Sequence, residues 1–189
     1  SAALLDGRPV GFQSDFPVLG PPPRGLQYAE GGPVGICVSL RENRKFDTTL
    51  LLVPRIAVLG IGCRRGIAAG DIAAAVRGAF ARSGISIRCV AGVCSVSLKR
   101  DEPGLAEFCR SRGFSLRFFS PEELGRVPGE FSGSPFVRRV TGVDNVCERS
   151  AVLGSGGRLI LKKQAENGVT VAAAAPEYHA VFDGEESRR

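Results

Sequence analysis

Residues 56–82 read IAVLGIGCRRGIAAGDIAAAVRGAFAR, and this stretch decides the fold. The continuous apolar run Ile56–Ile61 is typical of a strand that is buried on both faces. A glycine-rich loop follows, and apolar residues then recur at helical spacing over residues 68–82, where Ile72 and Val76 share one stripe. A buried strand, a tight loop and an amphipathic helix predict the first unit of an α/β sheet.

Strands and helices alternate along the rest of residues 54–176. The expected strands are residues 85–93, 116–119, 158–161 and 169–174, and helices are expected from Pro103, after Ser120, from Ser134-Pro135 and over residues 146–153. The last two strands flank Asn167-Gly168, a turn sequence that predicts a hairpin with an antiparallel strand. We therefore expect an α/β domain, a three-layer α/β/α sandwich with a largely parallel, mixed sheet.

Polar residues stand at three of these helix starts and are expected to act as caps. They are Asp101 or Glu102, Ser120 with Glu123, and Asn145 with Glu148. This interpretation makes Glu123 a cap and dipole partner rather than a catalyst.

The segments that flank the α/β region differ in composition. Residues 1–33 are rich in Pro and Gly, which predicts an extended arm. Two short apolar runs, residues 34–40 and 48–53, are separated by a polar turn and predict a hairpin. We thus expect a connector over residues 1–53, a domain over residues 54–176 and a polar tail over residues 177–189.

The charge of the chain is concentrated in the predicted domain. The net charge of the 189 residues is +6; the five acids and five bases of residues 1–54 cancel, and residues 177–189 carry −2, so residues 55–176 hold +8. This excess predicts an anionic partner, with an evenly solvated basic surface as the alternative. The aromatic side chains available for base stacking are few, with 11 Phe, two Tyr and no Trp, which argues against nucleic acid. No apolar run is long enough for a membrane span.

Cysteine and histidine content narrows the chemistry further. The six cysteines show no C-x-x-C spacing and no leader precedes them, so reduced thiols in a cytoplasmic protein are expected. The single histidine, His179, lies in the tail, which excludes a Ser-His-Asp or Cys-His centre within the basic region. The chain lacks Met and begins at Ser1, so a piece of a longer protein is expected.

The loop after the first strand is the sharpest functional motif. Gly60, Gly62 and Gly66 allow close approach of a ligand to the backbone, and Arg64 and Arg65 add fork-shaped donors for carboxylates or phosphates. The spacing G-x-G-x-x-x-G departs from the dinucleotide fingerprint, and no acid for a ribose follows the second strand. The alternative is a tight turn with two solvated arginines.

A second polar segment follows the next strand. Parallel strands end at one edge of a sheet, so Lys99, Asp101 and Glu102 are expected near the arginines. A carboxylate there suits a general base and Lys99 suits an acidic substrate. The alternative is a basic turn followed by a helix cap. On pattern alone, Lys163 and Thr170 belong to an exposed strand end.

These fragments together resemble the C-terminal domain of the cobalt-precorrin-5A hydrolase family (CbiG). The matching motifs are Leu59–Gly66 (LGIGCRRG), Leu98–Leu105 (LKRDEPGL), Phe118–Leu124 (FFSPEEL), Phe136-Val137, Thr141–Glu148 (TGVDNVCE), Lys163 and Gly168–Ala172 (GVTVA). Residues 1–53 resemble the family's central connector. The helix start at residues 67–72 departs from the family's pattern, as does Ser97, and the family's N-terminal domain is absent. The same domain occurs alone as CobE of the aerobic cobalamin pathway.

The resemblance implies hydrolysis of the ring-A lactone of cobalt-precorrin-5A, with release of acetaldehyde and formation of cobalt-precorrin-5B. It implies a polycarboxylate cobalt-tetrapyrrole as substrate and no separate cofactor or metal site, because cobalt arrives inside the substrate. The expected partners are the missing N-terminal domain and a second copy in a homodimer, with neither nucleic acid nor membrane. A non-catalytic tetrapyrrole-binding or carrier module is the alternative.

Site roles follow as hypotheses. Asp101 or Glu102 is expected to act as the base, and the loop N–H groups between Gly62 and Gly66 are expected to stabilise an oxyanion. The expected substrate-binding residues are Gly60, Gly62, Cys63, Arg64, Arg65, Gly66, Lys99, Glu123, Thr141, Glu148, Lys163 and Thr170.

Overall fold

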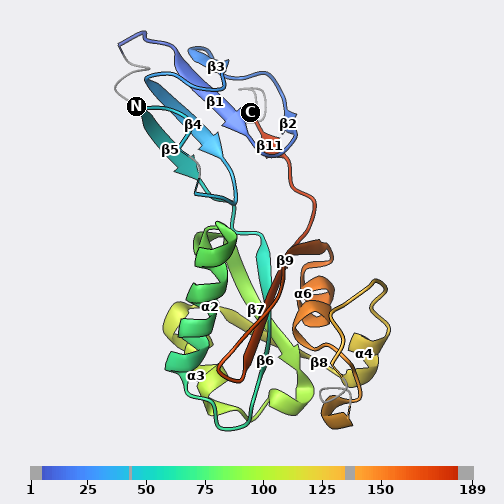
Figure 1. Ribbon diagram of the computed structural model, residues 1–189. Coiled ribbons are helices and arrows are strands. Elements are labelled where there is room, and N and C mark those ends of the chain that lie inside the picture. Colours follow the sequence, from blue (N-terminus) through green and yellow to red (C-terminus); the bar gives the residue numbers. More distant parts are fainter. Residues whose placement is uncertain (1–5, 43, 135–138, 183–189) are drawn as a thin grey trace, which may run out of the picture. The chain divides into compact units, whose positions relative to one another are not determined.

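The computed structural model describes residues 6–42, 44–134 and 139–182 (Figure 1). The chain divides into two compact units. The smaller unit comprises Ser1–Pro54, Gly84–Arg88 and Tyr178–Arg189, and the larger comprises Arg55–Ser83 and Cys89–Glu177. No described helix is both long and apolar enough to span a membrane.

The larger unit is built around a five-stranded mixed sheet with the order β8-β7-β6-β10-β9. Its strands are β6 (Ala57–Cys63), β7 (Val90–Val96), β8 (Ser115–Phe119), β9 (Arg158–Glu166) and β10 (Val169–Ala175). Strands β6, β7 and β8 run parallel, whereas β10 is antiparallel to both of its neighbours. The predicted largely parallel sheet with a closing hairpin is confirmed.

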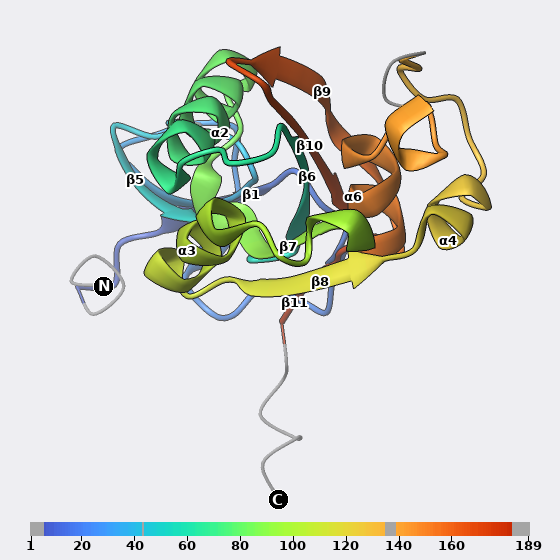
Figure 2. The same cartoon turned by 90° about the horizontal axis from the view of Figure 1, so that it is seen from below.

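Helices cover both faces of this sheet (Figure 2). Helices α2 (Ala69–Ser83) and α3 (Pro103–Arg112) pack together on one face. Helix α6 (Cys147–Ser155) lies across the other face, with the short helix α4 (Pro121–Gly125) against it. The three-layer α/β/α arrangement is thus as predicted.

The two helical layers meet the sheet in different ways. On the α2 side the core is aliphatic, and Leu59, Ile61, Ile72 and Val76 are completely buried. On the α6 side the helix backbone approaches the strand so closely that a Cβ at Gly60 would collide with the carbonyl of Cys147. The lack of a side chain at position 60 therefore allows α6 to pack there.

Some local structure in this part of the chain differs from the prediction. The strand expected over residues 85–93 begins only at Val90, because Ile87–Cys89 is a 3₁₀ turn and because Ile85 belongs to the smaller unit, where it forms a bridge with Arg41. A second 3₁₀ turn, Ser97–Lys99, follows β7. The predicted helix start at Ser134-Pro135 lies partly outside the described residues, and residues 139–141 are helical.

The smaller unit holds a four-stranded, all-parallel sheet with the order β3-β1-β4-β5. Its strands are β1 (Val10–Ser14), β3 (Leu26–Tyr28), β4 (Val34–Val38) and β5 (Thr48–Leu52). The predicted hairpin is wrong, since β4 and β5 run parallel. Phe46 of the connection is buried over paired Gly11 and Gly35, where a Cβ on either glycine would collide with its ring.

The expected arm and tail also contain regular structure. Besides β1 and β3, the arm forms β2 (Val18–Leu19), which pairs in parallel with β11 (Ala180–Val181). A small apolar core explains the difference, since it joins residues from both segments. Its buried members are Val10, Phe12, Leu26, Val38 and Ala180, with Phe16, Tyr178 and Phe182 packed against them.

Candidate functional site

A pocket of about 880 Å³ opens at one edge of the five-stranded sheet. Its walls come from the carboxyl ends of β6 and β7, the loops that follow them, residues 140–146, and the β9–β10 hairpin. This is the edge at which open α/β sheets bind ligands. Eight of the residues singled out from the sequence meet in its lining: Gly62, Cys63, Arg64, Arg65, Lys99, Thr141, Lys163 and Thr170.

The arginine loop is attached to the hairpin turn. Asn167 and Gly168 both have positive φ (49° and 79°), as the predicted tight turn requires. The Arg64 N–H donates to the carbonyl of Gly168 at 2.9 Å, and the Arg64 side chain packs against Gly168. Arg64 and Arg65 are exposed and form no ion pair with a described residue. Their guanidinium groups therefore face solvent at the pocket.

Glu102 joins the loops that follow β6 and β7. Its Oε1 accepts a hydrogen bond from the Gly66 N–H at 3.0 Å, and its Oε2 accepts one from Lys99 Nζ at 3.2 Å. The bond from Gly66 above all, and then Lys99 and Arg65, hold the pKa of this carboxyl below its usual range. The carboxylate is thus ionised and directed away from the start of α3.

The predicted cap of α3 is wrong for this reason. Glu102 occupies the N-cap position but makes no cap bond with its side chain, since both of its oxygens are engaged by Gly66 and Lys99. Asp101 is exposed, and neither carboxylate lines the pocket. Gly66 also lies outside the lining, with its N–H used by Glu102 and the Arg64 N–H used by Gly168. The expected oxyanion donors of this loop are therefore largely committed within the protein.

Three further predicted substrate-binding residues lie outside the pocket lining. Gly60 is covered by α6. Glu123 belongs to the capping box predicted with Ser120: the Ser120 N–H donates to Glu123 Oε2 at 2.6 Å and the Glu123 N–H donates to Ser120 Oγ at 3.2 Å. Glu148 is only 1% exposed and is enclosed behind the pocket wall.

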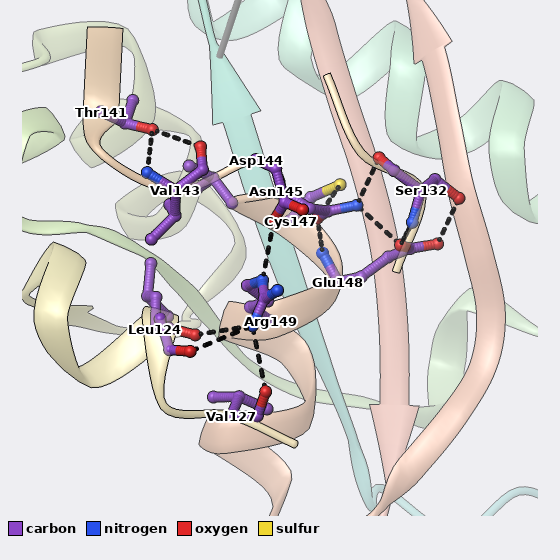
Figure 3. Close-up of polar contacts among 12 residues, drawn as sticks. Leu124, Val127, Ser132, Thr141, Val143, Asp144, Asn145, Cys147, Glu148 and Arg149 are labelled. Atoms are coloured by element: carbon purple, nitrogen blue, oxygen red, sulfur yellow. Dashed lines mark hydrogen bonds and ion pairs between the residues drawn. The ribbon is translucent and has the colours of Figure 1, made fainter. Parts of the chain in front are cut away.

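Glu148 is the centre of a buried polar network (Figure 3). Its Oε2 accepts from Asn145 Nδ2 at 2.6 Å and from the Ser132 N–H at 2.8 Å. Its Oε1 accepts from the Lys163 N–H at 2.8 Å and from Ser132 Oγ at 3.3 Å. The predicted capping box is half formed, since Asn145 Oδ1 accepts the Glu148 N–H at 2.8 Å but the Glu148 carboxylate turns to other donors.

Arg149, which was not among the residues predicted from the sequence, joins α6 to residues between Leu124 and Asp144 (Figure 3). Its Nε donates to Asp144 Oδ1 at 3.1 Å, and its Nη1 donates to the carbonyls of Leu124 and Val127 at 3.1 and 3.0 Å. Cationic donors commonly satisfy the last carbonyls of a helix in this way. The contacts hold the end of α4 and the 140–146 wall against α6.

The apolar part of the pocket was not predicted from the sequence. Val96, Val146 and Val169 are buried in its lining, whereas Leu98 and Val140 are 57% and 61% exposed there. Large apolar side chains exposed beside cations are typical of a binding surface. A detectable signal was present for Leu98, which directly precedes Lys99; Val140 is brought to the site only by folding.

Acids and thiols in the lining carry little reactivity. Glu166 is the one acidic residue among the described lining residues, and Arg82 pairs with it at 3.2 Å. Burial raises the pKa of the Cys63 thiol, an effect that nearby Lys99 reduces. Cys63 is thus a protonated thiol at neutral pH. Among the described residues, no group of three His, Cys, Asp or Glu side chains could hold a metal ion.

Curated relatives match the region that contains the pocket. A cobalt-precorrin-5A hydrolase of Priestia megaterium is 31% identical over 138 residues, which is 72% of this chain and 37% of the relative. A cobalt-precorrin-5A hydrolase of Salmonella typhimurium is 34% identical over 138 residues, 72% of this chain and 39% of the relative. The chain therefore spans about two fifths of the length of these relatives.

Solved structures are similar to the same region and beyond it. CobE, a protein from the cobalamin (vitamin B12) biosynthetic pathway, is similar with a TM-score of 0.58 and 30% identity, over 67% of this chain and 94% of CobE. A putative cobalamin biosynthesis protein G homolog from Sulfolobus solfataricus shares the fold with a TM-score of 0.54 and 19% identity, over 93% of this chain and 53% of that one.

A family model settles which group these similarities define. The model described as "Cobalamin synthesis G C-terminus" matches residues 57–174, which include the described strands and helices of the larger unit, apart from the last residue of β10, and all of the residues that line the pocket. The motifs that resembled CbiG fall within this range, apart from the connector residues. The chain belongs to the cobalamin synthesis G C-terminal (CbiG) family.

Proposed function

We propose that this chain acts in cobalamin biosynthesis by binding cobalt-precorrin-5A and taking part in hydrolysis of its ring-A lactone, with release of acetaldehyde and formation of cobalt-precorrin-5B. The observation that carries the proposal is the composition of the pocket. Four cationic side chains, Arg64, Arg65, Lys99 and Lys163, line a cavity that also has apolar walls. A tetrapyrrole with carboxylates on its periphery and an apolar face matches both features.

The physical fit is specific in three respects. The volume of about 880 Å³ lies within the range of small-molecule sites. Arg64 and Arg65 offer paired donors that suit carboxylates, and they are not consumed by described acids. Glu166 does not oppose an anionic ligand strongly, because Arg82 neutralises it.

Hydrolysis of the lactone requires an activated water and stabilisation of the oxyanion. Within our proposal, Lys99 and the two arginines stabilise negative charge, since the N–H groups of Arg64 and Gly66 are already engaged. Glu102 is the first proposed base, because its carboxylate accepts a hydrogen bond from Lys99. Its exposed neighbour Asp101 is the second proposed base.

A carrier function is the second candidate, and one observation favours it. Among the described residues, the pocket lining contains no carboxylate that is free of a cation, because Glu166 faces Arg82. If this chain only carries the tetrapyrrole, the catalytic groups must come from elsewhere. We propose that they come from a region corresponding to the length that the relatives have beyond this chain.

Two measurements on the full chain test these proposals. Titration with cobalt-precorrin-5A, followed by its visible absorption, is expected to give a saturable spectral change. An acetaldehyde assay on the same mixture separates the candidates: release supports hydrolysis by this chain, whereas binding without release supports the carrier function. The absence of any spectral change at saturating concentrations would contradict both.

A further inference from the structure

Strand β9 contains a bulge beside the pocket. Its register with β10 pairs Gln164 with Val171 and Leu161 with Ala173. Lys162 and Lys163 therefore stand together opposite Ala172. An extra residue of this kind changes the direction of side chains along a strand and is frequent next to functional sites.

The bulge places two neighbouring parts of β9 on opposite faces of the sheet. Ala172 is paired with Gly60, whose open side faces α6, so Leu161 and its partner Ala173 belong to the other face. Leu161 is buried there, while Lys163 lines the pocket. Residues two apart in a regular strand share a face. The bulge therefore lets Leu161 remain in the core while Lys163 reaches the pocket.

Glu148 satisfies the backbone group that the bulge leaves without a partner in the strand ladder. The Lys163 N–H donates to Glu148 Oε1 at 2.8 Å. The carboxylate is buried, and its three other donors come from Ser132 and Asn145. Lys163 Nζ does not pair with it; the ammonium donates to the Ser132 carbonyl at 3.4 Å, and Lys163 lines the pocket.

We propose that Glu148 is a positioning residue, which holds the β9 bulge and thereby directs the Lys163 ammonium toward the anionic ligand. The inference rests on the proposed function for the role of Lys163, and on the contacts above for the role of Glu148. It assigns Glu148 an indirect part in binding, since its carboxylate does not reach the pocket.

Glu148→Gln tests the bulge because it places a donor where the structure needs an acceptor. The single oxygen of Gln cannot serve both sets of donors. If it faces Asn145 and the Ser132 N–H, the amide nitrogen meets the Lys163 N–H; if it faces Lys163, an uncharged acceptor replaces the carboxylate there and the nitrogen meets two other donors. Glu148→Asp keeps the charge but shortens the reach to Lys163 by one methylene. Ser150→Ala is the matched control, because Ser150 is a buried polar residue of α6 that bonds Val146 and not β9.

Amide hydrogen exchange of Lys163, measured by NMR without any ligand, tests the structural half. We expect at least tenfold faster exchange at this amide in Glu148→Gln and Glu148→Asp, with unchanged protection of β10 amides and no effect in Ser150→Ala. Unchanged exchange at Lys163 in both Glu148 variants would overturn the inference.

Binding of a stable cobalt porphyrin with carboxylate side chains tests the functional half. Lys163→Ala is expected to weaken affinity about tenfold and to lessen its dependence on ionic strength. Glu148→Gln should reproduce both effects, and the double variant should remain within about threefold of either single one, because the two residues act on one contact. Independent effects, about hundredfold in the double variant, would contradict the coupling.

The two measurements separate the possible failures. If wild type binds no tetrapyrrole, the proposed function fails while the exchange result still decides whether Glu148 holds the bulge. If wild type binds but the salt dependence of Glu148→Gln equals that of wild type, the positioning role is wrong and the proposed function stands.

Discussion

The carboxylate of Glu102 accepts the N–H of Gly66 across 36 residues of chain, at 3.0 Å. This bond connects the arginine loop to the start of α3. Lys99, in the loop after β7, donates a second hydrogen bond to the same carboxylate. Two loops that follow neighbouring parallel strands are thereby held at one edge of the sheet. The cationic wall of the pocket depends on this connection.

Glu102→Gln is expected to lower the free energy of unfolding by about 1–2 kcal/mol at pH 7, because it removes the charge that strengthens both hydrogen bonds. Urea denaturation of both proteins measures the difference. Asp101→Asn is the control, since Asp101 is exposed and outside the pocket lining, and we expect a change within about 0.5 kcal/mol.

Wild type and Glu102→Gln should also differ in how their free energy of unfolding depends on pH. The pKa of Glu102 is lowered from its ordinary value of 4.5, so the folded state favours the ionised form. The contribution of the Glu102 charge to the free energy of unfolding is fully present above the ordinary pKa, and it is lost as the pH falls through the lower, folded-state pKa. The stability gap between wild type and Glu102→Gln should therefore narrow between pH 5 and about pH 3; a constant gap would show that the charge of Glu102 contributes nothing.

Gly60→Ala is expected to destabilise the protein by about 3 kcal/mol, because its methyl group would collide with the Cys147 carbonyl of α6. Gly70→Ala offers the matched control: Gly70 lies in the first turn of α2 with open space around its Cβ position, so the same substitution should be neutral or stabilise by up to about 0.5 kcal/mol. Thermal and urea unfolding measure both. Equal effects of the two substitutions would refute the close approach of α6.

Phe46→Ala should cost about 3–4 kcal/mol, since the ring is buried over Gly11 and Gly35. Urea unfolding checks the value, and Tyr28→Ala, which removes a 59% exposed ring in the same sheet, serves as control. A loss below about 1 kcal/mol for Phe46→Ala would mean that the ring does not fix the crossover between β4 and β5.

Cys63 provides a chemical probe of the pocket. Because burial raises the pKa of its thiol, alkylation by iodoacetamide should be slow at pH 7 and accelerate above pH 9. A bound tetrapyrrole should slow the reaction, since Cys63 lines the pocket. Mass spectrometry of the Cys63 peptide follows the modification, with Cys63→Ser as the blank. Modification that is unaffected by saturating tetrapyrrole would place the ligand elsewhere.

Local patterns account for what the sequence predicted correctly. Strand β6, helix α2 and the Ser120 capping box depend on periodicity or on residues three apart, and each is confirmed. The glycine-arginine loop was likewise predicted from its composition. Each of these features has a signal within a short window of sequence, even where, as for β6, its partners are distant.

The predictions that were wrong depend on partners distant in sequence. Strand β5 pairs in parallel because Phe46 packs on two glycines, one of them 35 residues earlier in the chain. The Glu102 carboxylate does not cap α3 but accepts the N–H of Gly66, and the Glu148 carboxylate accepts the N–H of Lys163 instead of closing its predicted capping box. Competition between a local and a remote donor is settled by packing, which no short window of sequence contains.

The central claim is that Arg64 and Arg65 bind the carboxylates of a cobalt-tetrapyrrole in this pocket. Titration of the Arg64→Ala/Arg65→Ala variant with cobalt-precorrin-5A, followed by absorption, tests it most directly. Arg77→Ala/Arg88→Ala is the matched control, because it removes the same charge from exposed positions outside the pocket. We predict a loss of affinity of at least about thirtyfold for the first variant and less than about threefold for the second, with unchanged unfolding of both. Equal affinities of the two variants would contradict the claim.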